Sequence, residues 1–256
     1  MIRLERLWRQ FGTGVSFTLF GLGGLFLAAV VFPVINLAFR DTATRAAIAQ
    51  RAVHATWRLF VSVMVGLRVI DFEVEGAEHL QDVSGTLVIA NHPSLIDVVL
   101  IMSLMNRTQC VVKSGVWANP FMRGVVRATN YIPNLGDPEK LIGDCVAALR
   151  TGNNLVLFPE GSRTVPGTRP RMQRGFANIA IKANAPVRLV AVSCTPPTLL
   201  KGEKWYQSPL SRPLFRVRVC ERLEMAAFSG SGVPSRAVRD LSTYVAQRFE
   251  EISAHA

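Results

Sequence analysis

The chain has 256 residues, of which 49% are hydrophobic, and its formal net charge is +11. The mean hydropathy of +0.26 is high for a soluble enzyme of this length. A basic, apolar chain favours an anionic membrane surface as its partner, ahead of acidic substrates. The sequence has no recognisable nucleic-acid-reading motif, so we expect no nucleic-acid partner. The four cysteines are widely spaced without a CxxC pair, which argues against a zinc site and a disulfide framework and indicates a reducing compartment.

Residues 1–70 are predicted to form a membrane-embedding helical region. No charged residue occurs between Gln10 and Phe39, and this stretch exceeds the ~20 apolar residues that cross a bilayer. Central glycines and Pro33 disfavour a straight spanning helix. Basic residues flank both ends, so charge gives no orientation, and a segment that dips into one leaflet is the alternative. A second helix is expected over residues 42–67 in the headgroup zone, unless both helices only pack on the following domain.

Residues 71–256 are predicted to form an α/β domain. Strands alternate with helices along it, which indicates a mainly parallel sheet flanked by helices, with ligands at the carboxyl ends of the strands. The expected strands are residues 70–75, 87–90, 109–112, 155–158 and 213–219, the expected helices 94–105, 137–150 and one from Ser235 onward, with an apolar, turn-rich segment at 117–124 and a flexible link at 229–232.

The strand at residues 87–90 is predicted to run into a polar corner. Pro93 ends the strand, and Ser94 is a good helix N-cap, so Asp97 is expected in the first turn of the next helix. On one continuous helix His92 and Asp97 would lie on different faces. A corner between them allows the Asp97 carboxylate to turn back toward the histidine. A carboxylate on one ring nitrogen would leave the other nitrogen to act as a general base. The structural alternative is that Asp97 only caps the helix.

A second corner follows the strand at residues 155–158. Glu160 can bond a hydroxyl, Gly161 permits a close backbone approach, and Arg163 can bind a phosphate or carboxylate with two parallel bonds. No acidic residue follows Glu160 until Glu203, which favours an anionic ligand or lipid headgroup; the alternative is a solvated basic loop. The basic residues in that span are Arg163, Arg169, Arg171, Arg174, Lys182, Arg188 and Lys201.

Together the two corners resemble the HxxxxD and FPEGTR blocks of the glycerolipid acyltransferases, and most closely those of the lysophosphatidic acid acyltransferase type. The matching residues are 91–97 and 158–164, and the resemblance extends over residues 71–224. Residues 172–176 are similar to the basic-glycine segment of that family. Lys113 and residues 119–121 are similar to its block between the two corners.

The resemblance implies that His92 is the base and Asp97 its orienting partner. It implies that Glu160, Gly161 and Arg163 hold the acceptor, and the matching blocks add Ser162, Lys113 and Arg174 as substrate-binding candidates. It further implies an acyl group delivered from acyl-CoA or acyl carrier protein to a lysophospholipid hydroxyl, most closely 1-acyl-glycerol-3-phosphate. No covalent acyl-enzyme, metal or cofactor is expected, and the chain lacks a G-x-S-x-G elbow. The implied location is a membrane, with the active site on the cytoplasmic side, as in a bacterial inner membrane.

One departure bears on the acceptor. Where phosphatidate-forming members carry an arginine after the block between the corners, this chain has Asn134. This difference leaves open a specialised acyltransferase with a non-standard acceptor or an unusual acyl chain. The alternative from another class is a non-catalytic module that binds anionic membranes.

Overall fold

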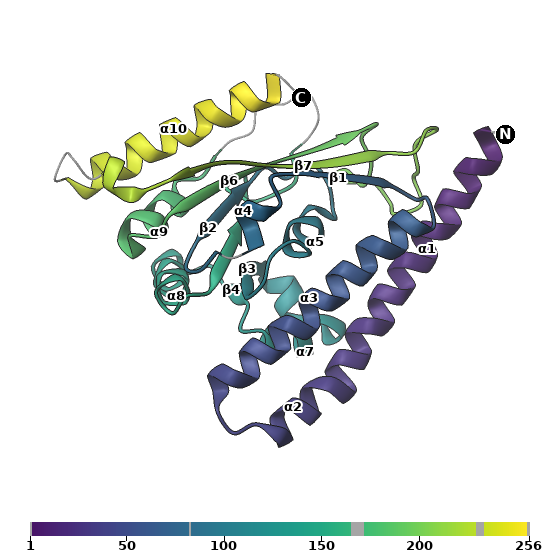
Figure 1. Cartoon of the computed structure of the whole chain (residues 1–256), viewed down its shortest axis with the longest axis horizontal. Helices are drawn as coiled ribbons and strands as arrows, with labels where there is room; N and C mark the ends of the chain where they lie inside the picture. The colour runs from purple at the N-terminus through teal and green to yellow at the C-terminus, as the bar shows by residue number, and fades with distance from the viewer. Residues whose placement is uncertain (1, 82, 165–171, 229–232, 255–256) are drawn as a thin grey trace.

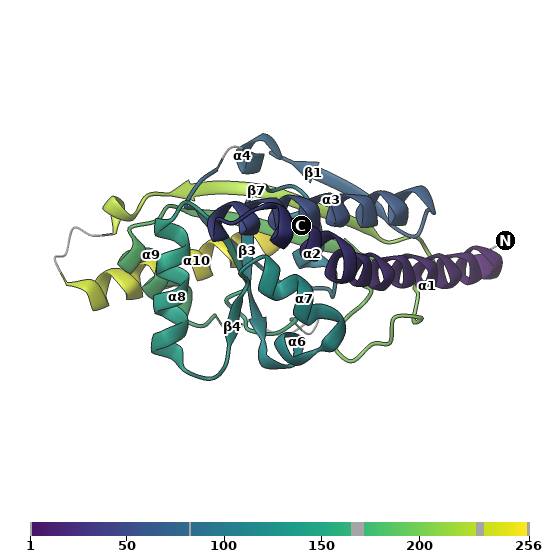
Figure 2. The same cartoon turned by 90° about the horizontal axis from the view of Figure 1, so that it is seen from below.

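The computed structural model describes residues 2–81, 83–164, 172–228 and 233–254. Within these residues, a seven-stranded sheet has the order β1-β7-β6-β2-β5-β3-β4 and helices cover both of its faces (Figures 1 and 2). The strands are β1 (Asp71–Glu75), β2 (Leu87–Ala90), β3 (Thr108–Lys113), β4 (Ile132–Asn134), β5 (Asn154–Leu157), β6 (Val187–Thr195) and β7 (Leu214–Leu223).

The sheet is mainly parallel, which confirms the predicted fold class. Every neighbouring pair of strands is parallel except β6 and β7, which run antiparallel. The carboxyl ends of β2, β3, β4, β5 and β6 therefore lie along one edge of the sheet. Both polar corners lie at this edge, because they follow β2 and β5.

Alternating residues of the central strands supply two apolar layers. Val88 and Ala90 face a core shared with the N-terminal helices, whereas Leu87 and Ile89 face the core beneath the C-terminal helices. All four side chains are fully buried. Burial on both sides explains why this short strand is continuously hydrophobic. The helices of the second layer are α8 (Pro138–Arg150), α9 (Gly175–Ala183) and α10 (Pro234–Ala254).

The N-terminal region is a helical hairpin. Its elements are α1 (Ile2–Phe26), a π-helical segment η1 (Leu27–Val31), α2 (Phe32–Ala38) and α3 (Thr42–Gly66). Because Pro33 has no backbone N–H, it cannot donate the helical hydrogen bond to the carbonyl four residues earlier. This missing bond accounts for the irregular helix at η1. The run Arg3–Ala38 is long and apolar enough to cross a membrane, by length and composition alone.

The structure also corrects several predicted boundaries. The helix expected over residues 94–105 is shorter, as α5 (Asp97–Met102), and the turn-rich segment is instead two helices, α6 (Ser114–Ala118) and α7 (Pro120–Ala128). Gly124 belongs to the segment expected to be rich in turns, but it lies inside α7. Its lack of a side chain permits a close contact with η1, since a Cβ there would come within 2.7 Å of Ala28. Two short elements, α4 (Glu78–Gln81) and η2 (Met225–Ala227), complete the fold. The predicted link at 229–232 lies outside the described residues.

Candidate active site

His92 and Asp97 lie together at the carboxyl end of β2. His92 Nδ1 is 2.9 Å from Asp97 Oδ2. The aspartate is fully buried, while the histidine side chain is 19% exposed. Because a carboxylate accepts, this contact assigns the proton to Nδ1 and leaves the lone pair on Nε2. The carboxylate therefore turns back toward the imidazole, as expected from the corner, while the role of His92 as a base stays a prediction.

The backbone of the corner aims Asp97 at the histidine. Ser94 N–H donates to Asp97 Oδ2 at 2.6 Å, and Ser94 Oγ accepts from Ile96 N–H at 3.2 Å. The first of these bonds is the reciprocal half of the expected capping box, although α5 begins only at Asp97. Burial raises the pKa of Asp97, while its bond to His92 opposes that rise. Burying the ionised Asp97 carboxylate therefore costs free energy, and the carboxylate is stabilised by its two donors, His92 Nδ1 and Ser94 N–H.

The second corner holds the backbone of His92. The N–H of His92 donates to Glu160 Oε1 at 3.2 Å, and its carbonyl accepts from Thr164 N–H at 2.9 Å. The Phe158 ring stacks on the imidazole, with 4.3 Å between ring centroids. Three residues of the second motif thus fix the position of the histidine from two directions.

Asn91 fastens the same corner to the neighbouring strand. Its side-chain amide donates to the Val192 carbonyl at 2.8 Å, and its Oδ1 accepts from Val192 N–H at 2.7 Å. The pair continues the β2–β6 ladder beyond Ala90, where β2 ends. Sequence reasoning did not assign Asn91 a role of its own, because its partner lies 101 residues away.

Glu160 is half-buried, and burial raises the pKa of its carboxyl group. Within the part of the chain that the structure describes, its buried Oε2 has no hydrogen-bond partner, and the same holds for Asp97 Oδ1. The next residue, Gly161, has a φ of +67°, and a Cβ there would come within 2.7 Å of the Gln173 side chain. Glycine therefore permits the turn and leaves room for the Gln173 side chain, while the close backbone approach to a ligand stays a prediction.

Arg163 points its guanidinium at the chain that follows β6. Its Nη1 donates to the carbonyls of Leu199 and Leu200 at 3.0 and 2.9 Å. The Leu199 carbonyl also accepts from Leu95 N–H at 3.1 Å. Arg163 thus ties the second corner to the first through one turn, in addition to the anion-binding role expected for it.

The remaining predicted substrate-binding residues lie around these corners. Ser162 is half-buried next to Arg163. Arg174 is exposed at the start of α9, directly after Gln173, whose N–H donates to the Pro159 carbonyl. Lys113 is exposed at the end of β3, on the same sheet edge. Arg169 and Arg171 lie outside the described residues.

The part of the chain that contains both corners is similar to known acyltransferases. A family model described as Acyltransferase matches residues 71–194, which contain both corners. The 1-acyl-sn-glycerol-3-phosphate acyltransferase alpha of Mus musculus is 25% identical over 193 residues, covering 72% of this chain and 64% of the mouse protein. The Homo sapiens protein of the same name is 25% identical over 223 residues, covering 84% of this chain and 74% of the human protein. Over both corners, the chain is thus similar to proteins of the acyltransferase family.

The likeness extends to three-dimensional structure. The crystal structure of the 1-acyl-sn-glycerophosphate (LPA) acyltransferase PlsC from Thermotoga maritima matches with a TM-score of 0.69 and 20% sequence identity, over 98% of both chains. At this identity the match establishes a shared fold. The chain spans slightly less than two thirds of the length of the mouse relative.

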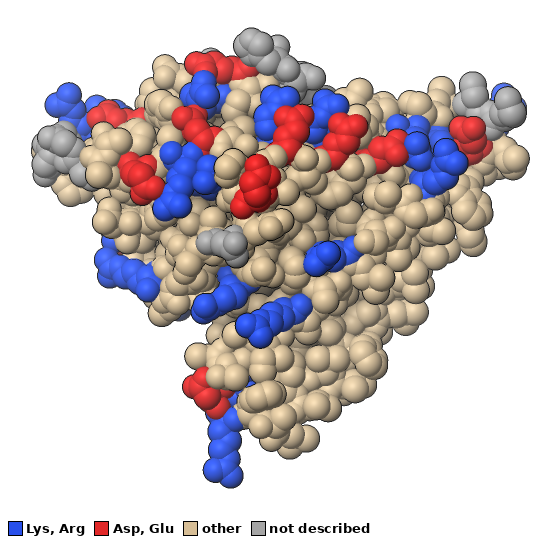
Figure 3. Space-filling view, in the orientation of Figure 1, with Lys and Arg blue, Asp and Glu red and all other residues tan. Residues whose placement is uncertain are grey.

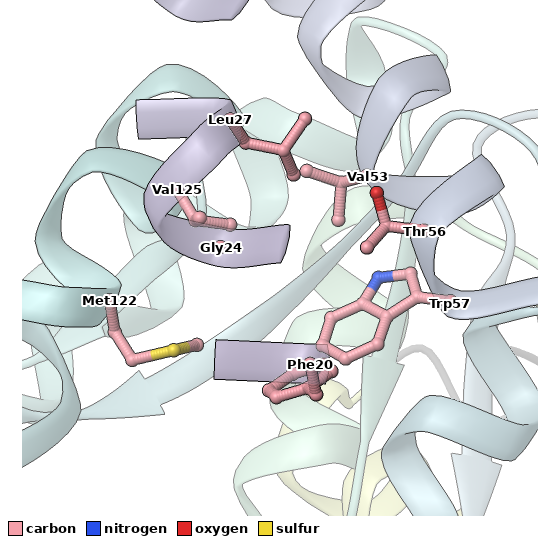
Figure 4. Close-up of a pocket in the computed structure, with 8 residues that line it drawn as sticks. All are labelled: Phe20, Gly24, Leu27, Val53, Thr56, Trp57, Met122 and Val125. Atoms are coloured by element: carbon pink, nitrogen blue, oxygen red, sulfur yellow. The ribbon is translucent and has the colours of Figure 1, made fainter. Parts of the chain in front are cut away.

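A small, shallow apolar pocket, open to solvent, lies among the N-terminal helices and α7 (Figure 4). Its walls come from α1, η1, α3 and α7, and none of the residues of the two corners lines it. The hydroxyl of Thr56 in its wall already donates to the Ala52 carbonyl, so the pocket suits hydrocarbon rather than a charged group. The lining residues are Phe20, Gly24, Leu27, Val53, Thr56, Trp57, Met122 and Val125.

Proposed function

We propose that this protein transfers an acyl group from a thioester donor, acyl-CoA or acyl carrier protein, to the hydroxyl of a lysophospholipid. The observation that carries the proposal is the 2.9 Å contact between His92 and the buried Asp97. A positioned base of this kind takes the proton from an attacking hydroxyl. The names of the mouse and human relatives support 1-acyl-glycerol-3-phosphate as the acceptor.

The reaction needs no covalent acyl-enzyme. As the acceptor oxygen attacks the thioester carbonyl, His92 Nε2 accepts the hydroxyl proton, and Asp97 stabilises the imidazolium that forms. When the tetrahedral intermediate collapses, the carbon–sulfur bond breaks and the proton passes from Nε2 to the leaving sulfur. The products are the ester and the free thiol, and the histidine returns to its starting state.

A second acceptor class is favoured by Asn134. It is exposed at the end of β4, where it is the register partner of Lys113 on β3. Its Oδ1 accepts from Gly136 N–H at 3.3 Å, within its own turn. A neutral amide therefore stands where the resemblance predicts a phosphate-binding arginine, which supports a specialised acyltransferase with a non-standard acceptor. Purified protein assayed with a panel of phosphorylated and neutral lysolipids separates the two classes.

We also propose that the helical hairpin embeds side-on in a membrane. Gly12 of α1 lies against Val69, and the π-helical segment η1 lies against Gly124, so the hairpin runs along the α/β body instead of projecting from it. In the orientation of Figure 3, the surface over α1 to α3 carries few charged side chains. A long apolar surface beside the body suits insertion into one leaflet. The cytoplasmic side is the corresponding location of the active site.

The test is acyl transfer from a long-chain thioester to a lysolipid in detergent or vesicles. His92→Ala should lower kcat by about 100- to 10,000-fold, because a positioned base contributes that much. His79→Ala is the matched control, since His79 is an exposed histidine on α4. A His92→Ala variant with near-full activity would contradict the mechanism. A wild-type protein that binds anionic vesicles but consumes no thioester would instead support the non-catalytic membrane module.

A further inference from the structure

The chain between β6 and β7 is bonded to the first turns of α1. Arg6 Nε donates to the Ser208 carbonyl at 2.9 Å, Gln10 Nε2 donates to the Tyr206 carbonyl at 2.8 Å, and Arg9 donates to the carbonyls of Pro209 and Leu210. Figures 1 and 2 show this chain reaching α1 near its N-terminal end. The two segments therefore form one surface, although about 200 residues separate them.

Large apolar side chains of both segments are exposed, and the part-exposed Trp205 ring also lies against Gly14 of α1. Trp205, Tyr206 and Leu210 are 47%, 44% and 62% exposed. On α1, the exposed side chains recur at helical spacing and continue along its length. They are Leu4, Leu7, Trp8, Phe11, Leu19, Leu22, Leu25 and Phe26. One apolar strip thus runs along α1, with the aromatic tip of the β6–β7 chain beside its first turns.

The charges around this strip are mostly positive. Residues 3–14 and 201–210 contain five cationic side chains and two carboxylates. One carboxylate, Glu203, accepts from Leu200 N–H, and Lys204 lies over the Tyr206 ring. Tryptophan and tyrosine beside lysine and arginine are typical of the water–membrane interface. The positive residues are Arg3, Arg6, Lys201 and Lys204, together with Arg9, which is buried and forms an ion pair with Glu5.

We propose that residues 201–210 form a second membrane anchor, which docks in the headgroup layer of an anionic membrane beside the first turns of α1. The proposal rests on the membrane association proposed above and adds a contact outside the helical hairpin. The exposed apolar side chains would insert into the membrane interface, and the basic side chains would attract anionic lipid headgroups. We name this surface the 201–210 anchor.

The anchor is linked to the catalytic corner. Its chain leaves β6 through Leu199, whose carbonyl accepts from both Arg163 and Leu95. Leu95 lies between His92 and Asp97. A membrane contact at residues 201–210 therefore sets the position of the bilayer relative to the site at which His92 acts.

The experiment measures binding of the full chain to vesicles of phosphatidylcholine, with and without added phosphatidylglycerol. The double variant Trp205→Ala/Leu210→Ser should bind about tenfold or more weakly, because it removes two apolar groups that insert. Lys201→Glu/Lys204→Glu should lose mainly the preference for phosphatidylglycerol. Leu135→Ser is the matched control, since Leu135 is as exposed as Leu210 and lies between β4 and α8. Acyl transfer to a detergent-solubilised acceptor should remain near the wild-type rate in all three variants.

The outcomes distinguish the two proposals. If the wild-type chain binds neither vesicle, membrane association fails, and the anchor fails with it. If the wild-type chain binds and both loop variants bind equally well, only the anchor is wrong. Equal weakening by Leu135→Ser would also overturn it, because the effect would not be specific to the anchor. If Trp205→Ala/Leu210→Ser instead dissociates a dimer in light scattering and leaves vesicle binding unchanged, the surface is a contact between copies.

Discussion

The Glu160 carboxylate accepts a hydrogen bond from the backbone N–H of His92, so the two polar corners meet at this histidine. The Thr164 N–H binds the carbonyl of the same residue. The second corner therefore has a role that its sequence does not suggest, which is to hold His92 in place. This geometry makes Glu160 a positioning residue, whatever further contact its Oε2 makes with an acceptor.

Two substitutions of Glu160 should separate positioning from acceptor binding. Glu160→Gln keeps an oxygen that accepts from His92 N–H, whereas Glu160→Ala leaves that half-buried donor unpaired. We expect kcat to fall about tenfold or more in the alanine variant and much less in the glutamine variant, because an unpaired buried donor costs about 1–3 kcal/mol. Steady-state kinetics with varied acceptor provides the measurement. A large rise in the acceptor KM with unchanged kcat in both variants would assign Glu160 to acceptor binding instead.

Asp97→Asn should lower activity without a matching loss of stability. The amide can place N–H against His92 Nδ1, which favours the tautomer with the proton on Nε2 and removes the base. We expect kcat to fall by about 100- to 10,000-fold. The measurement is kcat under saturating thioester, with wild-type protein prepared in parallel. Retention of full activity would show that Asp97 only shapes the corner.

The same variant gives a pH test. Burial raises the pKa of Asp97, so its ionised form is less stable in the folded chain than in the unfolded chain. This carboxyl group therefore favours folding below its unfolded pKa of about 3.9, and that contribution is lost as the pH rises through the folded pKa. Urea unfolding from acid to neutral pH should show Asp97→Asn gaining stability relative to wild type. A gain that shrinks with rising pH would contradict the assigned direction of the shift.

Asn134→Arg tests the acceptor. The new guanidinium would lie beside Lys113 at the sheet edge and could form a charge-assisted bond with a phosphate, worth about 1.5–3 kcal/mol. We expect the KM for 1-acyl-glycerol-3-phosphate to fall about tenfold or more, with little change for a neutral monoacylglycerol. Leu135→Arg controls for added positive charge, since it places the same group one residue away. Equal effects from both variants would mean that general attraction, and not a specific contact, is responsible.

The sequence predicts the parts of this site that depend on local chemistry. Short buried strands that are soon followed by Pro93 and Gly161 identify the corners, and the spacing of Ser94 and Asp97 gives the turn that brings the carboxylate to the histidine. These features are set by residues a few positions apart, which is why they can be recognised without coordinates. The fold class follows from the alternation of strands and helices for the same reason.

The long-range contacts could not be predicted in this way. The partner of Asn91 is the backbone of Val192, and the partners of Arg163 are backbone carbonyls, which carry no side-chain signal. The antiparallel course of β7 is likewise set by its neighbours, since its alternating pattern fits either direction. Tertiary packing also explains α7, where Gly124 serves a close helix contact.

Gly161→Ala should show the cost of forming the second corner. Its φ of +67° is unfavourable for alanine, and the added Cβ would also displace the flexible end of Gln173. We expect the free energy of unfolding to fall by about 1–2 kcal/mol, together with a loss of kcat, because Glu160 and Thr164, which contact the His92 backbone, lie in the same short segment as Gly161. Gly143→Ala is the matched control: Gly143 lies within α8 with open space around it, so alanine should raise stability by about 0.5–1 kcal/mol. Denaturant unfolding measures both, and a Gly161→Ala chain as stable as wild type would mean that the turn relaxes without consequence for His92.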